Sequence, residues 1–192
     1  MTPHLSAIFR AFQAIIPRRR HERGHGFSLT ELIVVIVILT ILLAISLAAL
    51  SRANKARSTA RCAANLRSLG LAFQNYAADN SDYYPLPTTS AQWEDLLRPY
   101  IHRPTLCCPV DQELFPATGS SYDWRDTGDP LSSLPGRRLT EVTRDNISLA
   151  FDALPGWHEQ HKIQVVCTDT SVHSMDDMAF LRELQLPVVT NP

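Results

Sequence analysis

Uncharged residues run without interruption from Leu32 to Leu50, and only Thr40 and Ser46 among them carry a hydroxyl group. A helix of this length covers about 28 Å, close to the roughly 30 Å of hydrocarbon in a bilayer. Buried helices of soluble proteins are usually shorter and apolar on one face only. The pattern therefore predicts one membrane-spanning helix over about residues 32–50.

The same helix is expected to continue well beyond the apolar run. No proline occurs from Ser51 to Asn80, and apolar side chains recur there at steps of three and four residues. This stripe consists of Ala53, Ala56, Ala60, Ala63, Leu66, Leu69, Phe73 and Tyr76. Gly70 is either a weak point of the helix or a point of close packing. The polar run 79–82 marks the end of the helix.

Residues 81–192 have the pattern of a small globular domain with short elements. Strands are predicted at Asn146–Ala153 and Lys162–Cys167, and a third is predicted to begin at Ser171–Ser174. The last two would form a hairpin through residues 168–170. Short helices are expected within 92–100 and 175–186, and residues 102–140 are expected to be mostly loop. The pattern as a whole predicts an α+β protein.

The first 26 residues are basic, with five arginines against the single acid Glu22. They fit a disordered arm or a leader held near anionic lipid, and the two interpretations are compatible. Basic residues also follow the apolar run, so the positive-inside rule does not fix its orientation. A secretory signal peptide is disfavoured because its apolar region is normally shorter and ends in a small-residue cleavage site.

The composition argues against several classes of function. The formal net charge of −1 gives no sign of nucleic-acid binding. The sequence contains no catalytic or phosphate-binding motif. We therefore expect that the protein is not an enzyme and that it binds no cofactor. The candidate metal ligands are the C-terminal histidines and acids His158, His161, Asp169, His173, Asp176 and Asp177. No calcium-binding Asp-x-Asp-x-Asp-Gly loop is present, and the pair His158-x-x-His161 is by itself a weak zinc signal, so no metal is predicted.

The stretch Gly26-Phe27-Ser28-Leu29-Thr30-Glu31-Leu32 leads directly into the apolar run. It resembles the processing motif of type IV prepilins and type II secretion pseudopilins. The resemblance implies that prepilin peptidase cuts between Gly26 and Phe27 and methylates the new amino group of Phe27. It also implies that Glu31 neutralises the amine of a neighbouring subunit during assembly. A carboxylate beside an apolar span is costly unless it is paired, which agrees with that role.

A second resemblance points to pilin-like proteins of planctomycete- and verrucomicrobia-type bacteria. It rests on the segment 62–67, on Cys108-Pro109 and on the spacing from His158 to His173. In those relatives an Asp-Gly turn joins the last two strands, whereas this chain has Thr170 in place of the glycine. A tight two-residue turn prefers glycine there.

These resemblances imply a pilin-like fold in which a long N-terminal helix packs on a small antiparallel sheet. Residues 1–26 would be a cytoplasmic leader, 27–80 the long helix and 81–192 an extracytoplasmic domain. The chain would cross the bacterial inner membrane once, with its N-terminus in the cytoplasm and its domain in the periplasm. An oxidising location favours at least one disulfide among Cys62, Cys107, Cys108 and Cys167, and buried free thiols are the alternative.

The implied function is that of a structural subunit of a type II secretion pseudopilus or a type IV pilus. Its partners would be prepilin peptidase, other pilin or pseudopilin subunits, the inner-membrane assembly machinery and membrane lipid. The alternative is a membrane-anchored binding module, such as a minor tip pilin that contacts a substrate or a surface.

Overall fold

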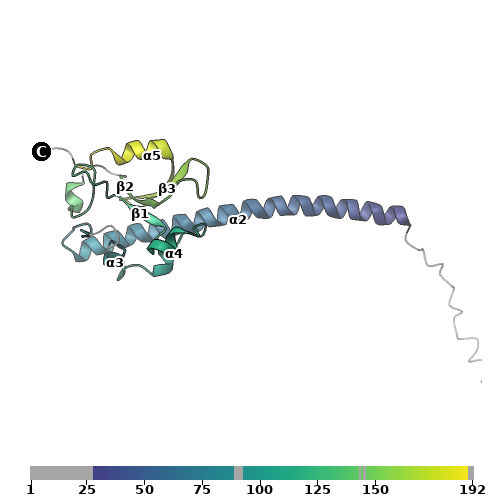
Figure 1. Cartoon of the computed structure of the whole chain (residues 1–192), viewed down its shortest axis with the longest axis horizontal. Helices are drawn as coiled ribbons and strands as arrows, with labels where there is room; N and C mark the ends of the chain where they lie inside the picture. The colour runs from purple at the N-terminus through teal and green to yellow at the C-terminus, as the bar shows by residue number, and fades with distance from the viewer. Residues whose placement is uncertain (1–27, 89–92, 143, 145, 190–192) are drawn as a thin grey trace, which may run out of the picture. The chain divides into compact units, whose positions relative to one another are not determined.

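The structure is a computed structural model that describes residues 28–88, 93–142, 144 and 146–189. The described residues divide into two compact units between Leu47 and Ala48. One long helix, α2 (Leu29–Asp79), contributes its first part to the N-terminal unit and its remainder to the C-terminal unit (Figure 1).

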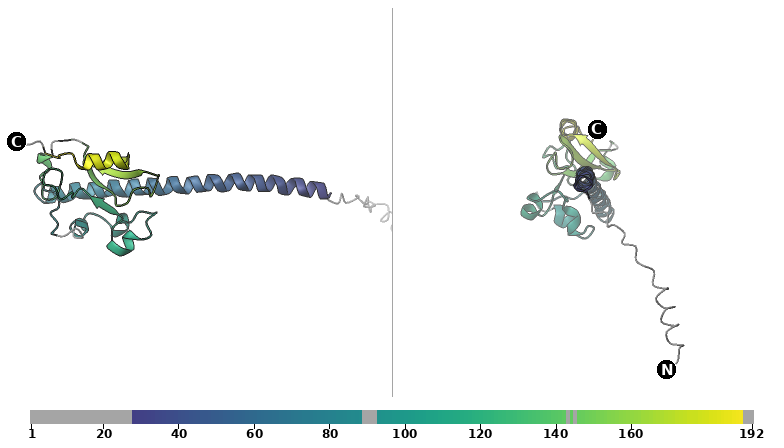
Figure 2. Two further views of the ribbon diagram at one scale, coloured as in Figure 1. Left: turned by 45° about the horizontal axis from the view of Figure 1, so that its top comes forward. Right: turned by 90° about the vertical axis from the view of Figure 1, so that its right-hand side faces the viewer.

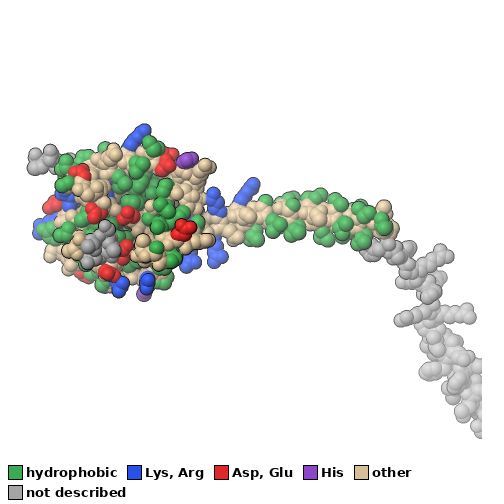
Figure 3. Space-filling model, in the orientation of Figure 1, with side chains coloured by type: hydrophobic (Ala, Val, Ile, Leu, Met, Phe, Trp, Pro, Cys, Tyr) green, Lys and Arg blue, Asp and Glu red, His purple; other side chains and the backbone are tan. Residues whose placement is uncertain are grey.

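The N-terminal unit consists of the apolar beginning of α2. Its aliphatic side chains are exposed, and α2 is long and apolar enough to cross a membrane. Figure 3 shows apolar side chains along the whole of this segment. The Thr40 hydroxyl donates to the Val37 carbonyl and the Ser46 hydroxyl to the Leu42 carbonyl, each at 2.8 Å. Because both hydroxyls are satisfied within the helix, they add little to the cost of placing it in lipid.

In the C-terminal unit, α2 buries one face from Cys62 onward. The buried residues of the helix are Cys62, Leu66, Leu69, Gly70, Ala72, Phe73 and Ala77. The predicted stripe is right at Leu66, Leu69 and Phe73 but wrong at its beginning, since Ala53, Ala56 and Ala60 are exposed. The reason is that the sheet and loops that cover the helix do not reach those residues.

A basic collar precedes this buried face. It consists of the exposed residues Arg52, Lys55, Arg57 and Arg61. No acidic residue lies between Ala48 and Arg61. The collar therefore carries an uncompensated positive charge along this part of α2.

Four antiparallel strands form the sheet, in the order β1-β2-β3-β4. The strands are β1 (Tyr122–Trp124), β2 (Ser148–Asp152), β3 (Lys162–Cys167) and β4 (Val172–Asp176). The bounds of β3 are those predicted, and the predicted hairpin of β3 and β4 is confirmed. Strand β1 lies inside a segment predicted to be mostly loop and was missed, because its three residues give too short a pattern.

The turn between β3 and β4 adopts the backbone conformation that the missing glycine would favour. Thr170 has a φ of +67°, a region that branched side chains rarely occupy. The carboxylate of Asp169 accepts hydrogen bonds from the amide and the hydroxyl of Ser171, at 2.9 and 2.6 Å. These bonds close the turn without a glycine.

The two faces of the sheet are covered by different helices (Figure 2). On one face, Phe73 of α2 stacks on Trp93 and Trp124, with ring centroids 5.9 and 5.1 Å apart. On the other face, Phe180 of α5 (Asp177–Leu184) packs in a cluster with Ile163 and Val165. Neighbouring residues of β3 thus point to opposite helices, which explains why that strand is buried on both sides.

Short helical segments complete the C-terminal unit. They are α3 (Trp93–Leu97), the 3-10 turn η2 (Arg103–Leu106), α4 (Leu114–Thr118) and the 3-10 turn η3 (Leu139–Glu141). Helices α3 and α5 lie within the two segments predicted to be helical. The long helix followed by a small antiparallel sheet confirms the predicted α+β, pilin-like layout.

Candidate functional site

The first turn of α2 is closed by two reciprocal hydrogen bonds between Ser28 and Glu31. The Glu31 carboxylate accepts from the Ser28 amide at 3.0 Å, and the Ser28 hydroxyl accepts from the Glu31 amide at 3.2 Å. This arrangement is a capping box, in which both side chains satisfy amide groups that a helix start leaves unpaired. Glu31 therefore stabilises the start of its own helix. The Ser-x-x-Glu spacing in the sequence is the signal that could have predicted this role.

The Glu31 carboxylate is exposed, and no salt bridge to it occurs within the part of the chain that the structure describes. The next charged residue along α2 is Arg52. Gly26 and Phe27, the predicted cleavage site, lie outside the described residues. The described part of the motif thus shows an ordered helix start that carries one negative charge.

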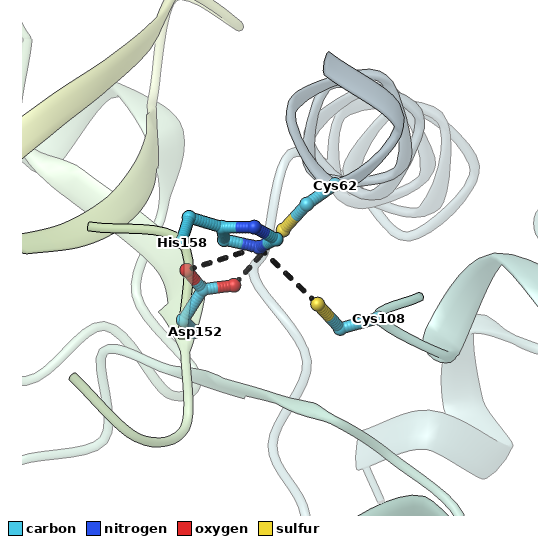
Figure 4. A group of neighbouring side chains, drawn as sticks. All are labelled: Cys62, Cys108, Asp152 and His158. Carbon is cyan, nitrogen blue, oxygen red and sulfur yellow. Dashed lines mark hydrogen bonds and ion pairs between the residues drawn. The ribbon is translucent and has the colours of Figure 1, made fainter. Parts of the chain in front are cut away.

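A second constellation lies in the C-terminal unit, where four buried side chains meet (Figure 4). Cys62 comes from α2, Cys108 from the loop after η2, Asp152 from the end of β2 and His158 from the loop before β3. All four side chains are at most 3 % exposed. One donor atom from each lies within 4.8 Å of every other.

Three contacts define the arrangement of these four groups. The Cys62 thiol donates to the Asp152 carboxylate at 3.0 Å, and the sulfur of Cys108 lies 3.2 Å from Nε2 of His158. The same Nε2 lies 4.0 Å from the Asp152 carboxylate. Nδ1 of His158 is buried and has no partner among the described residues. The sulfurs, a carboxylate oxygen and Nε2 therefore converge on one small volume.

The electrostatics of the four groups are strongly perturbed. The Cys62 thiol and the His158 ring lower the pKa of Cys108 to about 5. Burial raises the pKa of Asp152 to about 6, and the neighbouring Cys108 together with burial raises the pKa of Cys62. For His158, burial opposes protonation but the Cys108 sulfur outweighs it, so its pKa is raised. Such opposed shifts occur where ionisable groups share a low-dielectric space.

The N-terminal motif of the chain matches a known family model. Residues 23–47 match the family model described as a prokaryotic N-terminal methylation motif. The chain carries a prepilin-type methylation motif. This match supports the type IV pilin and pseudopilin family, in agreement with the resemblance of residues 26–32. No curated protein and no solved structure matches the chain significantly.

The prepilin-type motif has three consequences for the chain as a whole. It points to a structural subunit rather than to an enzyme. It implies processing by prepilin peptidase and assembly with other pilin subunits. Together with the apolar start of α2, it supports a membrane-anchored pilin.

The predicted disulfide is not seen, because all four cysteines are free thiols in the structure. Of the four cysteines, the structure brings Cys62 and Cys108 together. Cys107 is half-buried, with its sulfur 3.6 Å from the carbonyl oxygen of Cys108. Cys167 ends β3, where burial raises its pKa.

The sequence singles out Cys62, Cys108 and His158 separately, but it does not predict that they form one cluster. Asp152 was not singled out, because it appears only as a strand end. The other C-terminal candidates have local roles instead. Asp176 caps α5, His161 lies 3.4 Å from Asp177, and His173 contacts the Ser171 hydroxyl.

Proposed function

We propose that the mature chain is a structural subunit of an extracytoplasmic filament, either a type II secretion pseudopilus or a type IV pilus. The observation that carries the proposal is the prepilin-type methylation motif at residues 23–47, which includes the apolar beginning of α2. In this proposal the helix stores the subunit in the inner membrane and later packs in the filament core. Lipid is therefore its first partner, and other subunits replace lipid during assembly.

Processing would begin at the basic leader. Prepilin peptidase would cut between Gly26 and Phe27, and the new amino group of Phe27 would be methylated. Glycine before the cut suits this step because it has no side chain and adopts extended or left-handed backbone conformations readily. The leader of residues 1–26 would remain in the cytoplasm, and the C-terminal unit would lie in the periplasm.

Assembly would depend on the charge of Glu31. Cleavage creates a positive amine at Phe27, four residues before Glu31, so both groups occur at the same end of the apolar segment. A carboxylate that enters an apolar filament core is costly unless a cation pairs with it. The amine of a neighbouring subunit would supply that cation and would also set the axial register. The inner-membrane assembly machinery would deliver each subunit to this position.

N-terminal sequencing and intact mass analysis of the chain purified from its host membrane test the proposal. We expect the protein to begin at Phe27 and to carry one added methyl group. A Gly26→Val variant should retain its leader, whereas the matched Gly24→Val variant should be processed normally. A mature protein that still begins at Met1, or that begins beyond residue 45, would contradict the proposal.

A further inference from the structure

We propose that Cys62, Cys108, Asp152 and His158 form a closed structural zinc site in the C-terminal unit. The inference does not depend on the filament proposal, because it concerns how the domain is held together. It stands on the convergence of four ligands, two thiols, a carboxylate and an imidazole, that come from four separate segments of the chain (Figure 4).

The geometry of the donors is close to that of a tetrahedral zinc site. Zinc binds sulfur at about 2.3 Å and nitrogen or oxygen at about 2.0–2.2 Å, which places neighbouring donors roughly 3.3–3.8 Å apart. The contact between Cys108 and His158 is 3.2 Å, and that between Cys62 and Asp152 is 3.0 Å. The His158 to Asp152 contact is 4.0 Å, and no pair of donors exceeds 4.8 Å. Small side-chain adjustments would thus complete a tetrahedron.

The donor set favours zinc over calcium and magnesium. Two thiols and one imidazole are soft or borderline ligands, which calcium and magnesium do not favour. Four protein ligands are typical of structural zinc sites, whereas catalytic sites keep one position open for water or substrate. Since every ligand here is at most 3 % exposed, the site has no open position for a substrate.

The residues around the four donors support ligation. The Tyr122 hydroxyl donates to the Cys62 sulfur at 3.5 Å, and the Gln164 amide donates to the Asp152 carboxylate at 3.1 Å. The side-chain amide of Asn65 contacts the Tyr122 hydroxyl at 3.3 Å. Such outer contacts orient metal ligands and hold them in place.

A bound cation would also offset the free-energy cost of burying these four ionisable side chains. Two thiols, a carboxylate and an imidazole in a domain core are costly when they are ionised without compensation. Zinc would displace the two thiol protons and neutralise the resulting negative charge. It would join α2 to the loop after η2, to β2 and to the loop before β3.

Two other interpretations of the cluster are weaker. A cysteine–histidine–aspartate catalytic triad requires the acid to orient the histidine through the nitrogen that does not face the nucleophile. Here Cys108 and Asp152 both approach Nε2 of His158, and the Cys108 sulfur is buried. A disulfide between Cys62 and Cys108 would remove the thiol that donates to Asp152 and the thiol that contacts His158. These two buried polar side chains would then lose their present sulfur partners. Metal analysis and cobalt titration distinguish a catalytic triad or a disulfide from a zinc site.

The first experiment measures the metal content of the full chain, purified in detergent without chelators. We expect about one zinc ion per chain in the native protein. Cys62→Ser, Cys108→Ser and His158→Gln should lose most of it, while Cys107→Ser and His161→Gln, matched by residue type and position, should retain it. Zinc retained by both Cys62→Ser and Cys108→Ser would overturn the proposal. Zinc absent from a native chain with a Cys62–Cys108 disulfide would overturn it equally.

The second experiment avoids variants that could fail to fold. The native full chain is stripped of metal under reducing conditions and titrated with cobalt(II). A tetrahedral site with two thiolates should give an intense sulfur-to-cobalt charge-transfer band that saturates at one equivalent and disappears when zinc is added. Saturation without that band would mean a site without thiolates, and no binding at all would mean no site. Either result would overturn the proposal.

Discussion

The guanidinium of Arg125, just after β1, donates to both carboxylate oxygens of Glu183 in α5 at 2.8 Å. Further hydrogen bonds from Arg125 reach the carbonyl oxygens of Ser132, Glu183, Leu184 and Leu186. The Arg125 side chain is fully buried, and this burial lowers its pKa. Glu183 also accepts a hydrogen bond from the Ser148 hydroxyl of β2. Glu183 thus links α5 to the segment after β1 through Arg125 and to β2 through Ser148.

Glu183→Leu is expected to destabilise the full chain by about 3–5 kcal/mol, because it leaves the Arg125 charge buried without its partner. The control is Glu159→Leu, which removes the exposed pair with Lys162 and should cost about 1 kcal/mol or less. Urea unfolding in detergent, followed by circular dichroism, measures both. Equal losses in the two variants would show that the buried pair contributes no more than the exposed one.

Gly70 is a point of close packing rather than a weak point of α2. A Cβ atom at this position would lie 2.9 Å from Cγ2 of the buried Val166 in β3. Gly70→Ala gains about 1 kcal/mol of helix propensity but overpacks the core at a cost of about 1–3 kcal/mol. We expect a net loss of about 1 kcal/mol in the free energy of unfolding. In a Val166→Ala background the clash is removed, so the same substitution should become neutral or stabilising.

Glu94 gives the fold a specific pH dependence. Burial raises its pKa, with Asp123 and Asp95 adding to the effect, and one carboxylate oxygen is buried without a partner among the described residues. Because the folded-state pKa lies above the unfolded value, the group's contribution to stability is fully present at low pH. It is lost as the pH rises through the folded-state pKa.

Glu94→Gln should therefore be more stable than the native chain at pH 7, by about 1 kcal/mol or less, and the difference should vanish near pH 4. Thermal unfolding of both proteins across this pH range checks the prediction. The exposed Glu113→Gln variant should track the native chain throughout. A Glu94→Gln difference that did not change with pH would contradict the assigned cause.

The capping box allows the charge of Glu31 to be tested apart from its role in the helix start. Glu31→Gln keeps a side-chain oxygen for the Ser28 amide but removes the charge, so membrane insertion and cleavage should persist while filament assembly fails. Ser28→Ala keeps the charge and weakens the helix start by about 1 kcal/mol, so filaments should still form. Electron microscopy and pelleting of filaments provide the measurement. Normal assembly by Glu31→Gln would limit this residue to helix capping.

Local patterns explain which parts of the fold could be predicted from the sequence. Lys162–Cys167 was found at its observed bounds because a short apolar run lies between turn residues. The beginning of the buried face of α2 was placed too early, because alanines fit an apolar stripe whether or not anything covers them. Only the tertiary structure shows that cover starts at Cys62.

The cysteine, histidine and aspartate cluster could not be read from spacing. Cys62 and Asp152 are 90 residues apart, and Cys108 and His158 are 50 apart. Metal motifs that are visible in sequence place pairs of ligands a few residues apart on one turn or hairpin. Here each ligand comes from a different segment, so only the folded sheet and helix bring the four together.

The basic collar of α2 affects how a stored subunit would leave its membrane. A lysine or arginine beside anionic headgroups is held by about 1 kcal/mol, so the four residues together would resist extraction by up to roughly 4 kcal/mol. In the proposed assembly, extraction would require this work in addition to the work of moving the apolar helix. Phospholipid composition would then set part of the work of extraction, and bilayers poor in anionic lipid would release subunits more readily.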